Sequence, residues 1–91
     1  MKPFTSITIE EQDIKQGVRY NRCECPVALA ARRKFPWARS VDVDHSQLRV
    51  HNRHDTTVYH LTGEASRFIY CFDEGASVLP CVLQVQEDYT Y

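Results

Sequence analysis

The chain has 91 residues, of which 43% are hydrophobic and 25% are charged, and its formal net charge is −1. These values are typical of a folded protein and exclude wholesale disorder and a second domain. The lack of a basic excess argues against a dedicated nucleic-acid binder, so a nucleic-acid partner is not expected. We expect one domain over residues 1–91, with a polar aromatic tail at 87–91.

No apolar run is long enough to cross a bilayer, and the N-terminal segment lacks the apolar stretch of a signal peptide. We therefore expect a soluble cytoplasmic protein without a membrane partner, whose cysteines are mainly reduced. The four cysteines do not have the spacing of a disulfide framework; they are Cys23, Cys25, Cys71 and Cys81.

The first elements expected are a strand and a short helix. Apolar and polar residues alternate over Phe4–Thr8, which predicts a strand. Thr8 and Glu11 have the spacing of a capping box, so a brief helix is predicted to follow as far as Gln16. Gly17 is then expected to end this helix in a left-handed conformation.

A second helix is predicted over Val27–Phe35. The preceding Pro26 suits the first helical position, where its missing N–H has no intrahelical partner, and Pro36 ends the run. The apolar residues fall on one face, which should pack on a sheet; they are Val27, Ala28, Ala31 and Phe35.

Three strands are predicted next. Ser40–Asp44 alternates strictly, with Val41 and Val43 facing inward, and Leu48–Val50 continues the pattern on a return strand. Thr56–Leu61 is rich in β-branched and aromatic residues and should add a third antiparallel strand.

The last elements are a helix and a strand. Glu64–Asp73 has an apolar face formed by Ala65, Phe68, Ile69 and Phe72, with Gly75 as its C-terminal cap, and Val78–Gln86 reads as a strand. The element order predicts an α+β domain. Its sheet should have about four to five mostly antiparallel strands, with two to three helices packed on one face.

Two kinds of chemistry are conceivable around the second helix. A thiol at a helix N-terminus, such as that of Cys25, can have a lowered pKa and act in redox or nucleophilic chemistry. Cys23, Cys25, His51 and His54 are also residue types that bind zinc. The alternative is that the cysteines are packing and capping residues and the histidines solvated loop groups. Because the spacing fits closed zinc sites only loosely, no metal or cofactor is expected, and because no catalytic sequence signature is present, no catalytic residue is expected.

A binding surface is the favoured hypothesis. Basic residues flank the only tryptophan, and tyrosines are abundant near the C-terminus. Tyrosine, tryptophan and arginine are enriched in the hot spots of protein interfaces. The candidate partner-binding residues are Arg32, Arg33, Trp37, Arg39, Tyr89 and Tyr91.

The segment Cys25–Ala30 (CPVALA) resembles the helix start, CP[VI]ALA, of a group of small uncharacterised bacteriophage and prophage proteins. A late FDxG motif of that group is matched by Phe72–Gly75. An earlier "I…DI..G" stretch is matched by Ile9, Asp13, Ile14 and Gly17. The resemblance implies a phage origin and a host-cell setting, and it brings no catalytic residues.

The function expected from these features is non-enzymatic binding to a host protein or complex. Inhibition of a host defence complex, as by anti-CRISPR proteins, or of a host regulator is the concrete form of this expectation. One alternative is a zinc- or thiol-dependent protein using Cys23, Cys25, His51 and His54, and another is an accessory protein that contacts nucleic acid. Self-association into a homodimer also stays open.

Overall fold

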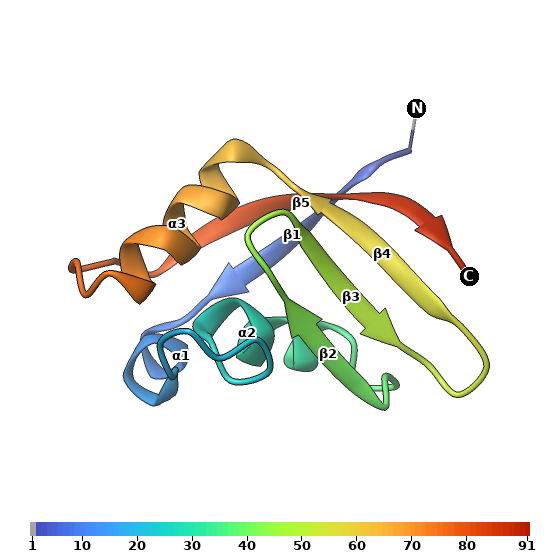
Figure 1. Cartoon of the computed structure of the whole chain (residues 1–91), viewed down its shortest axis with the longest axis horizontal. Helices are drawn as coiled ribbons and strands as arrows, with labels where there is room; N and C mark the ends of the chain where they lie inside the picture. The colour runs from blue at the N-terminus through green and yellow to red at the C-terminus, as the bar shows by residue number, and fades with distance from the viewer. Residues whose placement is uncertain (1) are drawn as a thin grey trace.

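The computed structural model describes residues 2–91. The elements follow the predicted order of strand, helix, helix, three strands, helix and strand (Figure 1). They are β1 (Phe4–Ile9), α1 (Glu11–Gln16), α2 (Pro26–Lys34), β2 (Ser40–Val43), β3 (Gln47–His51), β4 (Thr56–Leu61), α3 (Gly63–Asp73) and β5 (Cys81–Thr90).

All five strands form one curled antiparallel sheet in the order β1-β5-β4-β3-β2. Helix α2 packs on the two edge strands, β1 and β2, whereas α3 packs on the central strands β4 and β5. The described part of the chain therefore has the predicted α+β architecture, with its helices on one face of the sheet. The start of β1 and the end of β5 lie on the same side of the molecule, away from α1 and the end of α3 (Figure 1).

The core lies between the helices and the inner, concave face of the sheet. Val41 and Val43 point inward as predicted, and the alanines of α2 allow its backbone to approach the sheet closely. The buried inner-face residues are Ile7, Ile9, Val41, Val43, Leu48, Val50, Tyr59, Leu61, Leu83 and Val85. The helices contribute Val27, Ala28, Ala30, Ala31, Ala65, Phe68 and Ile69.

The start and end of α1 differ from the prediction. Strand β1 continues to Ile9, so Thr8 cannot cap the helix, and the capping box is formed by Glu10 and Asp13 instead. Gly17 has φ −66° and is not left-handed. A glycine is needed there because a Cβ would lie 2.7 Å from ring atoms of Pro26. The predicted left-handed stop is therefore wrong, and the residue serves close packing of α1 against the start of α2.

The ends of α3 follow the prediction closely. The Thr62 hydroxyl accepts a hydrogen bond from the Ala65 amide at the N-terminus. Gly75 (φ 86°) donates to Phe72 O, and the next amide donates to Cys71 O. This pair of hydrogen bonds is a Schellman motif, which satisfies carbonyls that the helix leaves without partners.

The last strand is displaced from its predicted position. It begins at Cys81, after Pro80, and runs through the segment that was expected to be a polar aromatic tail. Residues 87, 89 and 90 pair with Tyr59, Val58 and Thr57 of β4. Because this ladder satisfies the backbone, the residues from 87 to 90 are part of the sheet in spite of their polar composition.

Candidate binding surface

The Arg33 guanidinium is engaged in hydrogen bonds within the protein and is not free for a partner. Its guanidinium donates to both carboxylate oxygens of Asp13, at 3.0 and 2.8 Å, and to Thr8 O at 3.0 Å. Asp13 is buried, which by itself would raise its pKa, but the hydrogen bonds from Arg33 and the Glu10 amide hold the pKa below the ordinary value. Arg32 has a weaker constraint, an exposed ion pair with Glu24 at 3.0 Å.

Trp37 is 68% exposed and forms the outer end of an aromatic chain. Its ring contacts Phe35 edge-on, with 5.6 Å between centroids, and Phe35 stacks on Tyr59 at 5.4 Å. Since Phe35 and Tyr59 are buried on the inner side of the sheet, Trp37 is presented on that side.

Tyr89 and Tyr91 lie on the opposite, outer face, which is left uncovered by the helices of residues 2–91. A β-bulge in the pairing of β4 with β5 places Tyr59 opposite Glu87 but Val58 opposite Tyr89, so Asp88 is the extra residue. The bulge reverses which alternate residues of β5 face inward and which face outward. Without it, both tyrosines would face the core. Their rings lie 5.8 Å apart, and they are 47% and 66% exposed.

The same face holds a polar network that sequence reasoning missed. Asp42 accepts from Arg49 Nε at 2.7 Å and lies 2.6 Å from His51 Nε2. The other ring nitrogen of His51 lies 2.9 Å from Thr56 Oγ1. Burial opposes ionisation of Asp42, but its bonds to His51 and Arg49 lower its pKa. The predicted hairpin could have indicated this network, because the pairing of β2 with β3 sets Asp42 directly opposite Arg49.

A row of cross-strand neighbours joins these features at one end of the sheet. Ser40 pairs with His51, His51 with Thr56, and Thr56 exchanges two backbone hydrogen bonds with Tyr91. The Arg39 amide donates to His51 O at 2.8 Å, which brings this arginine to the same end. We call the group Val58, His51, Thr56, Tyr89 and Tyr91 the tyrosine face.

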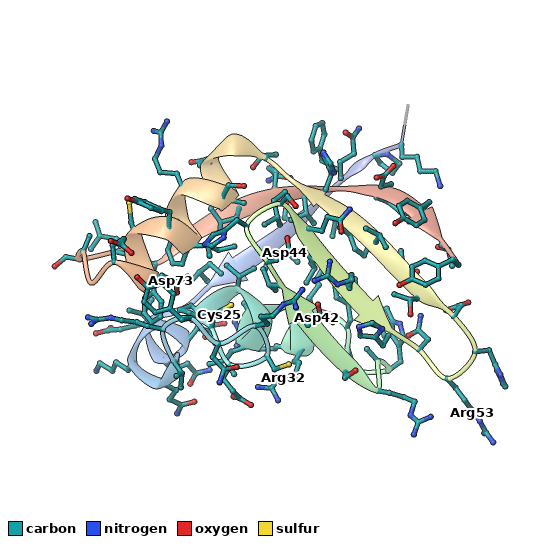
Figure 2. All side chains as sticks on the ribbon, viewed as in Figure 1. Cys25, Arg32, Asp42, Asp44, Arg53 and Asp73 are labelled. Carbon is teal, nitrogen blue, oxygen red and sulfur yellow. The ribbon has the colours of Figure 1, made fainter. Side chains whose placement is uncertain are left out.

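The predicted surface is thus divided. The structure brings Arg39, Tyr89 and Tyr91 to one end of the sheet, with Trp37 presented on the other side of the sheet. Arg33 faces α1 and the end of β1. The tip of the β3–β4 hairpin extends the end that bears the tyrosines, and Arg53 projects from it away from the body of the protein (Figure 2).

The order Asp42, His51, Thr56 is that of an acid, a base and a hydroxyl group, as in hydrolase triads. A hydrolase also needs a substrate cavity and donors for an oxyanion. The cavities at the start of α2 and beside His60 are lined by other residues, and Thr56 has its backbone N–H and C=O bonded to Tyr91. The bonds to Asp42 and Thr56 hold the His51 ring in place on the outer face.

Cys25, one of the two candidate thiols, lines a separate cavity of about 250 Å³ at the start of α2. Burial raises the pKa of Cys25, and the amides of Ala28 and Val27 offset this only in part. The lowered pKa considered from sequence is therefore wrong. His45 Nε2 lies 3.6 Å from Asp73 Oδ2 at this cavity. The cavity is lined by Tyr20, Asn21, Arg22, Cys25, Val43, Asp44, His45, Ile69 and Asp73.

The four candidate zinc ligands do not come together. Cys23 is exposed and Cys25 is buried, whereas His51 belongs to the outer-face network and His54 to the hairpin tip. Over residues 2–91, no group of three or more His, Cys, Asp or Glu side chains has an arrangement that could hold a metal ion.

Comparison with known proteins gave no match to a family model, to a curated protein or to a solved structure. Within the described residues, no helix has both the length and the apolar character needed to span a membrane.

Proposed function

We propose that this protein acts without catalysis, by binding another protein through the tyrosine face and the basic residues at its margin. The observation that carries this proposal is the exposed Tyr89–Tyr91 pair on the face of the sheet opposite the helices. Tyrosine side chains bury a large area at small entropic cost and are enriched in interface hot spots.

The tyrosine face is already ordered in the free protein. Val58 is only 1% exposed although it lies on the outer face, where Arg49 and Tyr89 are its cross-strand neighbours. His51 is held by hydrogen-bonding groups on both sides of its ring. An ordered surface loses less conformational entropy on binding, which favours affinity.

The charges at the margin favour an acidic partner. Of the basic residues in the described part of the chain, Arg39 and Arg53 at this margin have no carboxylate within 4 Å. Asp42, on the same face, is paired with the Arg49 guanidinium and lies within hydrogen-bond distance of His51. Complementary charge increases the association rate and selects among partners.

The resemblance to phage proteins supports a host protein as this partner. We propose either a defence complex, which the protein would inhibit as anti-CRISPR proteins do, or a host regulator. Such a target must present an acidic patch next to an apolar or aromatic contact for Tyr91.

The test is affinity capture from nuclease-treated bacterial lysate with the wild type and matched variants. Tyr91→Ala and the double variant Arg39→Glu, Arg53→Glu should lose a protein that the wild type retains. Tyr70→Ala, which removes an exposed tyrosine on α3, should retain it. Circular dichroism establishes that each variant is folded.

Three results would overturn the proposal. The first is that no protein is retained specifically by the wild type, and the second is that the Tyr91 and arginine variants retain the same proteins. The third is that retention depends on nucleic acid, which would favour the alternative of an accessory protein that contacts DNA or RNA.

A further inference from the structure

Strand β1 is an edge strand whose outward backbone groups can be identified from its pairing with β5. Ser6 is opposite Gln84, and Gln84 O accepts from the Thr62 hydroxyl on the β4 side. The backbone N–H and C=O of Gln84 therefore point toward β4, and those of Ser6 point toward the free edge of the sheet. By alternation, Phe4 and Thr8 also face outward, and Thr8 O does accept a hydrogen bond from Arg33 there.

The Phe4–Ser6 part of this edge lacks the devices that commonly protect a sheet edge from pairing, whereas Arg33 of α2 covers the outward carbonyl of Thr8. The segment Phe4–Ile9 (FTSITI) contains no charged residue, proline or glycine. In the part of the chain that the structure describes, the backbone groups of Phe4 and Ser6 have no partner on the outer side. Unprotected edges of this kind pair with strands of other chains.

The opposite edge is different. Strand β2 has only four residues, and one of them is Asp42, which is charged. Its Val43 amide donates to Arg22 O at 2.9 Å, so part of that edge is already covered by the loop before α2. The contrast indicates that β1 is the edge available for strand addition.

We propose that two copies of this chain pair through β1 as antiparallel strands centred on Ser6, which makes one continuous sheet. This register sets Ser6 opposite Ser6 of the second copy and Phe4 opposite the second copy's Thr8. The antiparallel ladder then forms about six backbone hydrogen bonds from groups that face outward in the monomer. Pro3 lies at a position directed toward β5, so its missing N–H removes none of them.

The side chains fit the same register. Lys2 is placed near Glu10 of the second copy, so opposite charges meet at both ends of the pair, although within the monomer Lys2 already pairs with Glu87 and Glu10 with Arg33. Phe4 and Val82 are 56% and 51% exposed, and Val82 is opposite Thr8 on the outer face. In the dimer, Phe4 of one copy lies beside Thr8 of the other, so Phe4, Thr8 and Val82 form one continuous row across the outer face. The register centred on Ser6 keeps its paired outward residues within β1, whereas a register centred on Phe4 needs Lys2 and one centred on Thr8 needs Glu10, both of which lie outside the strand.

This inference does not depend on the proposed function, because it uses β1 rather than the tyrosine face. Light scattering should give a mass that rises from 10.6 kDa toward twice that value when the concentration is raised from ~1 μM to ~1 mM. Ser6→Lys sets two like charges directly opposite each other, and Ser6→Pro removes an outward N–H without touching the β1–β5 ladder. Both variants should stay at 10.6 kDa, whereas Ser6→Thr should behave like the wild type.

The register has its own test in a Cys23→Ser background, which removes the exposed native thiol. Opposed Cα atoms of a hydrogen-bonded pair are ~5.5 Å apart, within disulfide range, so Ser6→Cys should give a cross-linked dimer on mild oxidation. Thr8→Cys should not, because two copies of that position are offset by ~13 Å along the strands.

A wild type that remains at 10.6 kDa at ~1 mM would overturn the proposal. A dimer that Ser6→Lys and Ser6→Pro leave unchanged would do the same. Efficient cross-linking of Thr8→Cys with none from Ser6→Cys would overturn the register. Loss of partner capture by Tyr91→Ala leaves these results unaffected, so failure of either proposal can be told from failure of the other.

Discussion

Arg33 donates to both carboxylate oxygens of Asp13, at 3.0 and 2.8 Å, and thereby ties the last turn of α2 to α1. The same guanidinium reaches Thr8 O at the end of β1, so one side chain joins three elements. Asp13 also accepts from the Glu10 amide in the capping box. A residue that sequence reasoning assigned to partner binding is therefore a structural connection.

Arg33→Ala should destabilise the protein by about 2 kcal/mol, because it leaves the buried Asp13 carboxylate without its charged partner. Arg32→Ala is the matched control, since it removes only an exposed ion pair and should cost less than about 0.5 kcal/mol. Urea unfolding of both variants measures the difference. Equal losses of stability would show that the Arg33–Asp13 contact is not formed in solution.

The three glycines should respond differently to alanine. Gly17→Ala brings a Cβ to within 2.7 Å of Pro26 and should cost about 2 kcal/mol through overpacking. Gly75→Ala forces a left-handed alanine (φ 86°) and should cost about 1 kcal/mol. Gly63→Ala meets no atom within 4 Å and should be neutral or stabilising by about 0.5 kcal/mol. Thermal unfolding ranks the three, and a costly Gly63 variant would contradict this account.

Local patterns predicted most of the elements, because alternation and helical periodicity depend on neighbours in sequence. The buried face of α3 and the inward valines of β2 are examples. The face on which Tyr89 and Tyr91 lie could not be predicted, since it depends on one extra residue in a long-range pairing. The role of Arg33 was missed for the same reason: Asp13 lies 20 residues away in sequence.

The thiols should differ sharply in reactivity. Cys23 is exposed, whereas Cys25 is buried and its pKa is raised by that burial. At pH 7.5, a small alkylating reagent should modify Cys25 at least roughly tenfold more slowly than Cys23, because the thiolate is the reactive species. Peptide mass spectrometry follows both sites, and in urea the rates should converge. Rapid alkylation of Cys25 in the folded protein would instead support the thiol-dependent alternative.

Acid should destabilise the protein through Asp44. Burial alone would raise the pKa of Asp44, but the amides of Ser46 and Gln47 and the Arg49 guanidinium lower it to about 2. A folded-state pKa below the unfolded value of 3.8 means that ionised Asp44 stabilises the fold above about pH 4. This stabilisation is lost as the pH falls from about 4 to about 2.

The loss should be roughly 1 kcal/mol, less than the full pKa difference implies, because the side chain is 34% exposed and solvent screens it. Asp44→Asn should therefore be less stable than the wild type at pH 7 and approach it at pH 2, as measured by urea unfolding at each pH. Glu11→Gln, which changes an exposed carboxylate in α1, should track the wild type throughout. A difference between Asp44→Asn and the wild type that stays constant with pH would mean that Asp44 acts by packing rather than by its charge.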